Sequence, residues 1–499
     1  MSVLAQVSTD ALLNVDLHAI APEIALTVAA VVVLVVDLFL PSRAKPLNAV
    51  VSALGIGAAA IALATLVGDR PAGGRETFGG MFVLDGYAML FKFLFLAVGG
   101  LTILISVTYL AERAERIQGE FYFLLLSSLL GMVAMASARD MLALFVALEL
   151  VSIPGFVMAG FKKADDRSNE AAVKFFLFGV LSSAVMLFGM SLIYGVTGST
   201  NLSAIAEALR AQGDAPLVTA SILLIVAGFA FKVSAVPFHF WAPDTYEGSP
   251  VPVAAFLSVA SKAAGFVGLL QLTFVAFPDY THVWAPGFAI ISAITMTVGN
   301  LVAMSQTNLV RMLAYSSIGQ SGYMLLPFGI VAGKGADLQN EAFAAVLTYI
   351  LIYSFMNLGA FAVAIAVGRK HPSNDIADYE GLAQREPALA VAMLFFLLSL
   401  AGMIPTAGFW AKLFVFRAAI GTGTLWLAAI GVANAVVGLF YYLSVGKRMF
   451  LREPAETSRI GVPYSIAAAL ALMALVIAAV TVYPEFFHHF SPRSTLVAF

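Results

Sequence analysis

Long apolar runs, separated by short polar connections, are the feature that most limits how this chain of 499 residues can fold. About fourteen such runs of roughly 18–30 residues occur, and each is long enough to cross a bilayer core of about 30 Å. Inside a bilayer the backbone is satisfied only by helices or closed barrels, and runs of this length indicate helices. With 61% hydrophobic and 11% charged residues, the chain is predicted to be an all-α polytopic membrane protein.

The predicted spans follow one another without a connection longer than about twenty residues, which leaves no room for a soluble catalytic domain. A short surface helix, N-L-S-A-I-A-E-A-L-R at 201–210, is predicted between the sixth and seventh spans. The spans are expected at 19–40, 47–68, 81–110, 120–137, 140–161, 169–197, 217–236, 251–277, 284–305, 308–331, 342–368, 387–420, 425–446 and 461–484.

The basic residues of the connections are distributed unequally. The odd-numbered connections hold fifteen Lys and Arg residues, whereas the even-numbered connections and the C-terminal tail hold six. Because basic loops stay on the cytoplasmic side, both termini are predicted to lie on the opposite, periplasmic side. The lipid bilayer is an expected partner and no nucleic-acid partner is predicted, whereas the net charge of −2 says nothing useful about partners.

Two prolines interrupt predicted spans. Pro237 follows Lys232 in F-K-V-S-A-V-P-F-H-F-W and removes a helical hydrogen bond, so the seventh span should break one turn past Lys232. Pro405 breaks the twelfth span in I-P-T-A-G-F-W-A-K. The breaks lie five spans apart, and an odd offset reverses direction in the membrane, as in the inverted repeats of transporters. Unrelated kinks are the alternative, because Pro and Trp are common in membrane helices.

Charged side chains remain at membrane depth, where each costs roughly 2.5–3.5 kcal/mol and is rarely left without a use. Lys232 precedes the first break, Lys262 lies in the eighth span and Lys412 follows the second break. Glu149 lies about nine residues into the fifth span. It forms either a structural ion pair with a neighbouring lysine or a switchable pair with Lys232, since a nearby carboxylate favours the charged form of a lysine and burial disfavours it.

Further polar residues lie near these positions. Lys262 has Ser258 one turn before it, which indicates either a hydrated relay or a helix–helix hydrogen bond. Lys174, about one turn inside the sixth span, is expected to tune Glu149. His239, after the first break, is expected either to pass protons or to cap the broken helix.

The remaining charged and polar side chains have more ordinary interpretations. Asp244 and Glu247 are expected to cap a loop, and Lys92 and Arg417 to snorkel to the ends of their spans. Two predicted spans also carry stripes of polar residues at helical spacing. A single stripe of this kind is typical of bundle packing, but together with Lys412 the two are consistent with a hydrated line from the centre of the protein towards its second half. The stripes are Arg311, Tyr315 and Tyr323 with Ser316 and Gln320 in the tenth span, and Tyr349, Tyr353 and Asn357 in the eleventh.

Several chemistries leave no trace in the sequence. Cysteine is absent, which excludes disulfides, thiolate metal sites and cysteine-ligated iron–sulfur clusters. There is no P-loop, dinucleotide fingerprint or H-E-x-x-H, and the six histidines include no in-membrane pair placed to ligate haem. No cofactor and no metal are predicted on this chain.

The first break resembles the signature of the antiporter-like subunits of respiratory complex I, which is shared with the multisubunit Na⁺/H⁺ antiporters. The segment reads F-K-V-S-A-V-P-F-H-F-W-A-P-D-T-Y-E-G-S-P-V-P-V-A-A-F-L-S-V-A-S-K over 231–262. Supporting matches are N-L-V-R-M-L-A-Y-S-S-I-G-Q-S-G-Y over 308–323 and the break at Pro405, so the resemblance covers roughly residues 120–450. Lys412, and an end soon after the last span, make the chain most similar to the subunit N family of bacterial NADH:quinone oxidoreductase.

The resemblance implies fourteen transmembrane helices, with inverted five-helix repeats at spans four to eight and nine to thirteen. We therefore expect an N-terminal three-helix segment at 1–118, repeats at 119–277 and 278–452, and a last helix with its tail at 453–499. By position, the resemblance also implies a proton relay. Its members are Glu149, Lys232, Lys262 and Lys412, with Lys174 and His239 as further relay or tuning residues.

The expected function is proton translocation by a membrane-arm subunit of NADH:quinone oxidoreductase in the bacterial inner membrane. NADH, FMN, iron–sulfur clusters and quinone are expected on partner subunits of complex I, so the chain is an enzyme subunit without redox chemistry of its own. The alternatives are a subunit of a multisubunit Na⁺/H⁺ antiporter and a non-pumping scaffold of the membrane arm. A third alternative is that this chain itself binds quinone, which only its general apolarity supports.

Overall fold

The computed structural model describes residues 15–68, 74–112, 117–213, 215–454 and 458–485. Within these ranges eleven helices are long and apolar enough to cross a membrane. The strands described there are the two of a short antiparallel hairpin, β1 (Arg75–Thr77) and β2 (Phe82–Leu84). The all-α membrane fold is thus confirmed, whereas the number of fourteen spans stays a prediction. Both chain ends, for which a periplasmic position was predicted, lie outside the described residues.

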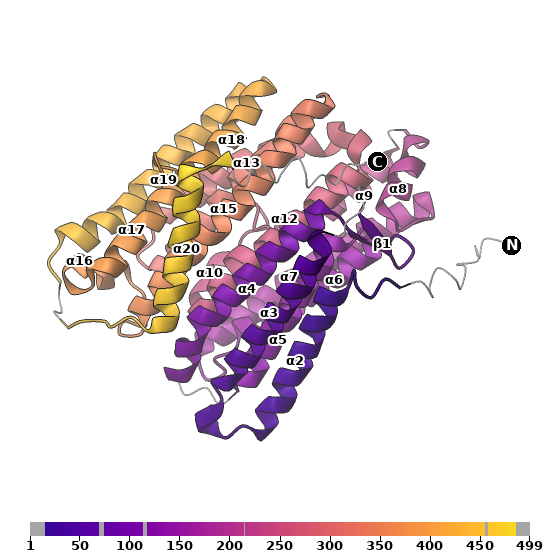
Figure 1. Ribbon diagram of the computed structural model, residues 1–499. Helices are drawn as coiled ribbons and strands as arrows, with labels where there is room; N and C mark the ends of the chain where they lie inside the picture. The colour runs from indigo at the N-terminus through magenta and orange to yellow at the C-terminus, as the bar shows by residue number, and fades with distance from the viewer. Residues whose placement is uncertain (1–14, 69–73, 113–116, 214, 455–457, 486–499) are drawn as a thin grey trace.

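The N-terminal segment is a layer of three helices that packs on the rest of the chain (Figure 1). Its helices are α2 (Ala21–Phe39), α3 (Leu47–Val67) and α4 (Gly86–Glu112), with the short turn η1 (Ser42–Ala44) between the first two. α2 contacts α3 and α5, and α3 contacts α4. Most of the surface of α2 and α3 is exposed and apolar, as expected for helices that face lipid.

The first predicted repeat spans α5 to η3, and α8 confirms the predicted short helix at 201–210. Asn201 caps α8 by accepting hydrogen bonds from the backbone N–H groups of Ser203 and Ala204. The elements are α5 (Gln118–Ser137), α6 (Met141–Ala159), α7 (Asp166–Thr197), α8 (Leu202–Arg210), α9 (Pro216–Lys232), α10 (Trp241–Gly248), α11 (Val251–Phe256), the π-helical turn η2 (Leu257–Ser261), α12 (Lys262–Gln271) and η3 (Leu272–Ala276).

The second predicted repeat and the last helix complete the chain. Their elements are η4 (Pro278–Tyr280), α13 (Thr281–Ala303), α14 (Leu309–Leu325), η5 (Leu326–Ile330), α15 (Ala336–Gly368), η6 (Ile376–Tyr379), α16 (Leu382–Arg385), α17 (Pro387–Ala401), α18 (Ala407–Gly421), α19 (Leu425–Leu451) and α20 (Tyr464–Val482). The predicted segment boundaries at 118, 277 and 452 fall at or within one residue of helix ends, but the division itself stays a prediction.

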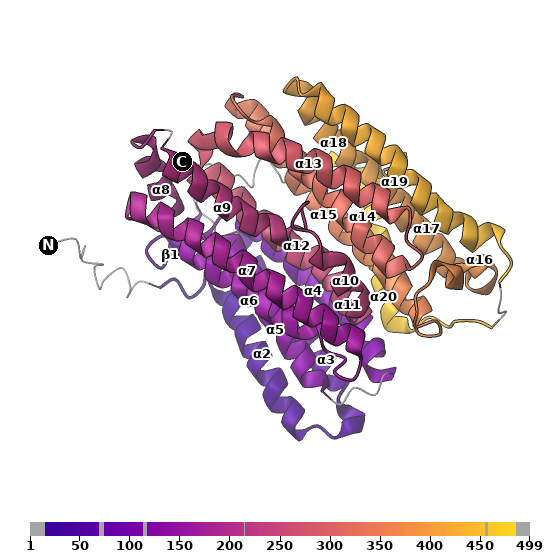
Figure 2. The ribbon, with the colours of Figure 1, turned by 180° about the vertical axis from the view of Figure 1, so that it is seen from behind.

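Two long helices form the centre of the bundle. The continuous helix Val251–Ala276 and α15 are the two candidate spans whose apolar windows are wholly buried, and α11 packs against α15. α20 contacts both α4 and α15, so the last helix joins the N-terminal segment to the second half. Seen from behind, α7 and α9 run side by side on the opposite face (Figure 2).

Both predicted helix breaks are present, and their first halves end in the same way. α9 ends at Lys232, where Ser234 adopts φ +57° and the Ala235 N–H donates to the Ala230 carbonyl at 2.8 Å. α17 ends at Ala401, where Gly402 adopts φ +81° and the Met403 N–H donates to the Leu398 carbonyl at 3.1 Å. These are Schellman-type ends, and Pro237 and Pro405 each follow the left-handed residue by three positions.

The first break begins earlier than the proline alone predicted. The helix stops at Lys232 itself and not one turn beyond it, because Ser234 closes the helix end before Pro237 is reached. Lys232 is therefore the last residue of a half-helix, which places its side chain at the edge of the break.

Candidate functional site

Lys232 is buried and its ammonium is held by a hydroxyl. Only 3% of the residue is exposed, and its Nζ donates to Ser152 Oγ of α6 at 2.9 Å. The stem of Lys232 lies against α12, since a Cβ at Gly265 would come within 2.9 Å of Lys232 Cγ. The first half-helix thus directs its terminal lysine between α6 and the central helix.

Glu149 lies one turn before Ser152 on α6, but it does not contact Lys232. Its Oε1 accepts a hydrogen bond from Ser183 Oγ of α7 at 2.5 Å, and its side chain is half-buried. The Glu149 charge acts on Lys232 at longer range. Ser152, Ser183 and Lys232 line one small cavity of about 10 Å³, close to the space that a single water needs. The serines that bind the two charges predicted to pair, Ser152 at Lys232 and Ser183 at Glu149, therefore line the same cavity.

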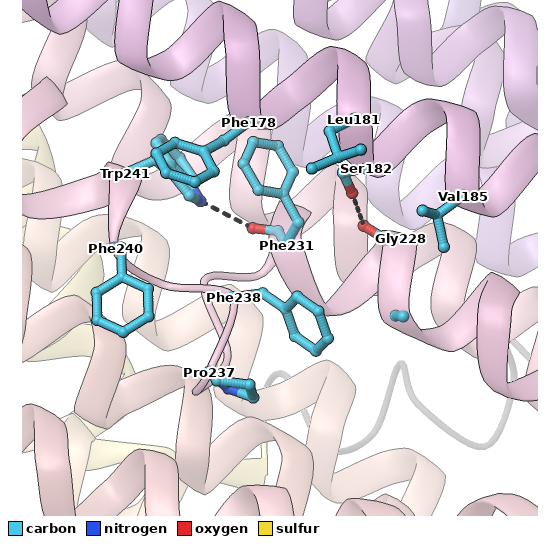
Figure 3. Close-up of a pocket in the computed structure, with 11 residues that line it drawn as sticks. Phe178, Leu181, Ser182, Val185, Gly228, Phe231, Pro237, Phe238, Phe240 and Trp241 are labelled. Carbon is cyan, nitrogen blue, oxygen red and sulfur yellow. Dashed lines mark hydrogen bonds between the residues drawn. The ribbon is translucent and has the colours of Figure 1, made fainter.

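An apolar groove runs along the outside of this site (Figure 3). Its volume is about 250 Å³, and the aromatic rings around it come from α7, α9 and the break, with Phe240 64% exposed. The groove and the Lys232 cavity share Ser182, Gly228 and Phe231 as lining residues. One layer of side chains therefore separates Lys232 from the apolar surface of the bundle.

Lys262 lies at the middle of the central helix, where it binds α14. The residue is 1% exposed, and its Nζ donates to the carbonyl of Ser317 at 2.9 Å and to Ser317 Oγ at 3.0 Å. Ser258, which was expected beside the ammonium, bonds to α15 instead. Its Oγ accepts from Asn357 Nδ2 at 2.9 Å, and its carbonyl accepts from Tyr353 OH at 3.2 Å. The contact with Ser317 fits both a relay and a helix–helix hydrogen bond.

Lys412 folds back from α18 onto the end of α17. Its residue is 5% exposed, and its Nζ donates to the carbonyls of Ala401 at 2.7 Å and Leu400 at 3.2 Å. The ammonium also lies 4.7 Å from the centroid of the Tyr323 ring, a cation–π distance. Carbonyls at the end of a half-helix are suited to hold a cation.

Two polar residues of α14, Ser317 and Gln320, contact Lys262 and the end of α17 that holds Lys412. Three residues after Ser317, the amide of Gln320 donates to the Leu400 carbonyl at 2.9 Å, and the same carbonyl accepts from Lys412. Tyr349 OH donates to Gln320 Oε1 at 2.5 Å, and Gln320 Nε2 lies 3.3 Å from Tyr442 OH. The structure thus brings residues of both predicted polar stripes to one place between the two lysines.

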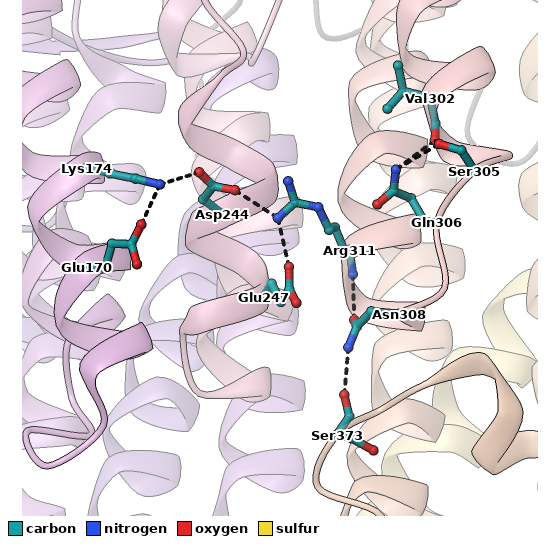
Figure 4. Close-up of polar contacts among 10 residues, drawn as sticks. All are labelled: Glu170, Lys174, Asp244, Glu247, Val302, Ser305, Gln306, Asn308, Arg311 and Ser373. Atoms are coloured by element: carbon teal, nitrogen blue, oxygen red, sulfur yellow. Dashed lines mark hydrogen bonds and ion pairs between the residues drawn. The ribbon is translucent and has the colours of Figure 1, made fainter.

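Lys174 belongs to a separate ionic cluster (Figure 4). Its Nζ pairs with Glu170 and with Asp244 of α10, each at 2.7 Å, and shows no contact with Glu149 among the described residues. Arg311 of α14 pairs with Asp244 and Glu247, each at 2.8 Å. The loop-capping interpretation of Asp244 and Glu247 is therefore wrong. Both lie on half-helix α10, because the helix resumes at Trp241. Both form ion pairs with side chains of neighbouring helices.

Three other predicted residues take different positions. His239 is 7% exposed in the break, and its Nδ1 has no hydrogen-bond partner among the described residues. Arg417 is exposed and pairs with Glu341 at 2.9 Å, which agrees with its snorkelling interpretation. That interpretation is wrong for Lys92, which is wholly buried and pairs with Glu23 of α2 at 2.6 Å, because the N-terminal segment covers it.

Sequence reasoning missed the hydroxyls that hold the lysines. Ser152 and Ser317 bind Lys232 and Lys262, and Ser183 binds Glu149. Ser152 had a signal, since it lies three residues after Glu149 and so on the same helix face. Ser317 and Ser183 lie on other helices, so only tertiary packing identifies them. The described residues contain no group of three or more His, Cys, Asp or Glu placed to hold a metal.

Comparison of the sequence with protein families gives a long match. The family described as NADH:quinone oxidoreductase/Mrp antiporter, TM, matches residues 138–438. A protein of Trichlorobacter lovleyi named NADH-quinone oxidoreductase subunit N is 41% identical over 94% of this chain and 94% of its own. A protein of Chlorobium chlorochromatii with the same name is 40% identical over 95% of this chain and 92% of its own.

Two solved structures have the same fold. A chain of respiratory complex I from Thermus thermophilus with bound Aureothin superimposes with a TM-score of 0.76 and 30% identity, over 94% of this chain and 98% of that chain. A chain of the Mrp complex from a Dietzia species gives a TM-score of 0.83 at 21% identity, over 96% of each chain. The second likeness concerns the fold alone.

Proposed function

Because this chain belongs to the NADH:quinone oxidoreductase/Mrp antiporter family, and within it to NADH-quinone oxidoreductase subunit N, we propose that it is a proton-translocating membrane subunit of complex I. The observation that carries the proposal is the series of three buried lysines, Lys232, Lys262 and Lys412, each held by hydroxyl or carbonyl oxygens at a helix break or in the central helix. Buried ammonium groups at membrane depth are expected to lie on ion pathways.

The energy for transport comes from outside this chain. NADH oxidation and quinone reduction take place on partner subunits of the membrane complex, and the resulting change reaches Glu149 on the half-buried face of α6. Moving one charge against the membrane potential costs about 2.3 kcal/mol per 100 mV. Two unit charges 4 Å apart interact by about 4 kcal/mol at an effective dielectric constant near 20, so a shift of Glu149 relative to Lys232 supplies energy of the required order.

The proton then moves along the lysines. A change at Glu149 alters how firmly Lys232 holds its proton, and Lys232 exchanges protons with Lys262 of the central helix. From Lys262 the polar line of Ser317, Gln320 and the Leu400 carbonyl leads to Lys412. Uptake is from the cytoplasm and release on the periplasmic side of the bacterial inner membrane, in keeping with the positive-inside distribution. NADH, FMN, iron–sulfur clusters and quinone belong to partner subunits.

The test is proton uptake driven by NADH oxidation in membrane vesicles that carry Lys262→Ala, with Lys447→Ala, an exposed lysine of α19, as the matched control. We expect loss of proton uptake with the complex fully assembled in the first variant and unchanged uptake in the second. Normal uptake with Lys262→Ala would reduce the chain to a scaffold of the membrane arm. Purification of the chain without an NADH-oxidising arm would favour the antiporter alternative.

A further inference from the structure

Half-helix α10 carries a buried hydroxyl that the proposed relay has not used. Tyr246 of α10 is wholly buried, and its hydroxyl has no hydrogen-bond partner among the described residues. The hydroxyls of Ser234 and Ser317 lie near it without a hydrogen bond to it. Ser317 accepts a hydrogen bond from the Lys262 ammonium, and Ser234 lies two positions after Lys232 in the break.

The break holds Tyr246 in this place. Trp241, the first residue of α10, donates from Nε1 to the Phe231 carbonyl at 3.1 Å, so α10 is tied to the end of α9 next to Lys232 (Figure 3). The Tyr246 ring packs edge-on against Trp241, with 5.9 Å between ring centroids. The tyrosine hydroxyl is thereby directed inward, whereas Asp244 and Glu247 on the same half-helix meet Lys174 and Arg311.

Ser234 has the same property as Tyr246. It is wholly buried, and its Oγ also has no partner among the described residues. Buried polar groups nearly always find a partner, and two neighbouring hydroxyls that lack one are suited to share a bound water. Hydroxyls and water both accept and donate hydrogen bonds, which is the requirement for a group that passes protons.

We infer that the Tyr246 hydroxyl, with a water held between it and Ser234, carries the proton from Lys232 to Ser317 and Lys262. This inference rests on the proposed function. The oxygen of Tyr246 accepts a proton from the Lys232 side as its own proton passes to the Lys262 side, so the hydroxyl stays neutral. One proton leaves the Lys232 ammonium and one arrives at the Lys262 amine. Rotation of the O–H bond then restores the starting arrangement.

The experiment compares Tyr246→Phe with Tyr122→Phe in the complete complex in membrane vesicles. Tyr122 of α5 is the matched control, because it is also wholly buried with a hydroxyl that lacks a partner in the described part of the chain. We expect Tyr246→Phe to lower NADH-driven proton uptake about tenfold or more and to change its solvent deuterium isotope effect, since a positioned proton-transfer group typically contributes 10²–10⁴-fold. Tyr122→Phe should match the parent in both measurements.

Two comparisons keep the inference distinct from the proposed function. If Lys262→Ala abolishes proton uptake and Tyr246→Phe leaves it unchanged, the inference is overturned and the proposed function stands. If Lys262→Ala also leaves uptake unchanged, the proposed function fails with it. Should Tyr246→Phe prevent assembly, Ser234→Ala decides in its place: slower uptake with an altered isotope effect supports the inference, and parental values overturn it.

Discussion

The Nζ atom of Lys412 lies 2.7 Å from the carbonyl oxygen of Ala401, the last residue of half-helix α17. The last carbonyls of a helix lack hydrogen-bond partners within the helix, and that end carries a partial negative charge. The Lys412 ammonium supplies the missing hydrogen-bond donor and a compensating positive charge. Lys232 and Lys262 are held by serines of neighbouring helices, whereas Lys412 is held mainly by the break that precedes it. The protonation state of Lys412 and the hydrogen bonding at the end of α17 are therefore linked.

Replacing Lys412 in two ways separates its structural and transport roles. Lys412→Met leaves the Ala401 and Leu400 carbonyls without the ammonium, which should cost about 1–3 kcal/mol and lower the thermal stability of the complex. Lys412→Arg keeps a cation and donors but holds its proton at any working pH. We expect it to assemble with near-parental stability and to lose proton uptake. Parental uptake in Lys412→Arg would contradict a protonation step at this residue.

Gly402 is expected to be sensitive for two reasons. Its φ of +81° disfavours any residue with a Cβ by roughly 1–2 kcal/mol, and a Cβ there would come within 2.7 Å of Lys412 Cδ. Gly402→Ala should therefore lower both stability and NADH-driven proton uptake. Gly423→Ala is the matched control, because Gly423 has φ +77° and open space around its Cβ position. It should lower stability by a similar amount and leave uptake unchanged.

Glu149→Gln removes the charge that acts on Lys232 but keeps an oxygen for Ser183. Because the amide cannot supply the Coulomb energy of a carboxylate, we expect coupled proton uptake to fall about tenfold or more, corresponding to roughly 1.4 kcal/mol, with assembly unchanged. Glu207→Gln on the surface helix α8 is the control for loss of a carboxylate. Equal uptake in the two variants would favour a structural role for Glu149.

The sequence predicted the positions of the charges better than their partners. Periodicity and prolines located Lys232, Lys262 and Lys412 and both breaks, because spans and Pro effects are local properties of the chain. The same reasoning placed Lys92 at a lipid-facing span end and Asp244 in a loop. The errors have different causes, since Asp244 lies on a helix that resumes at Trp241 directly after the break, whereas Lys92 is covered by a helix far away in sequence. Contacts of that kind depend on tertiary packing.

Asp244 is expected to hold half-helix α10 between the two halves of the bundle. Asp244→Asn weakens its pairs with Lys174 and Arg311. Lys174 still pairs with Glu170, and Arg311 still pairs with Glu247. Because these groups are about one third exposed, we expect a loss of about 1 kcal/mol or less, seen as faster amide hydrogen exchange over 241–248. Asp279→Asn breaks the exposed pair with Arg210 and should leave exchange in α10 unchanged.

The buried pair of Lys92 and Glu23 is expected to serve stability and not transport. Its Nζ–Oε1 distance is 2.6 Å, and it joins α4 to α2, which carry none of the three relay lysines. Lys92→Met leaves a partly buried carboxylate without its partner, which should cost roughly 3 kcal/mol and reduce the amount of assembled complex. The double variant Lys92→Met with Glu23→Gln should recover most of that loss, since no uncompensated charge remains. Proton uptake per NADH oxidised should equal the parental value in both variants, and a lower ratio in the well-assembled double variant would place this pair on the proton path.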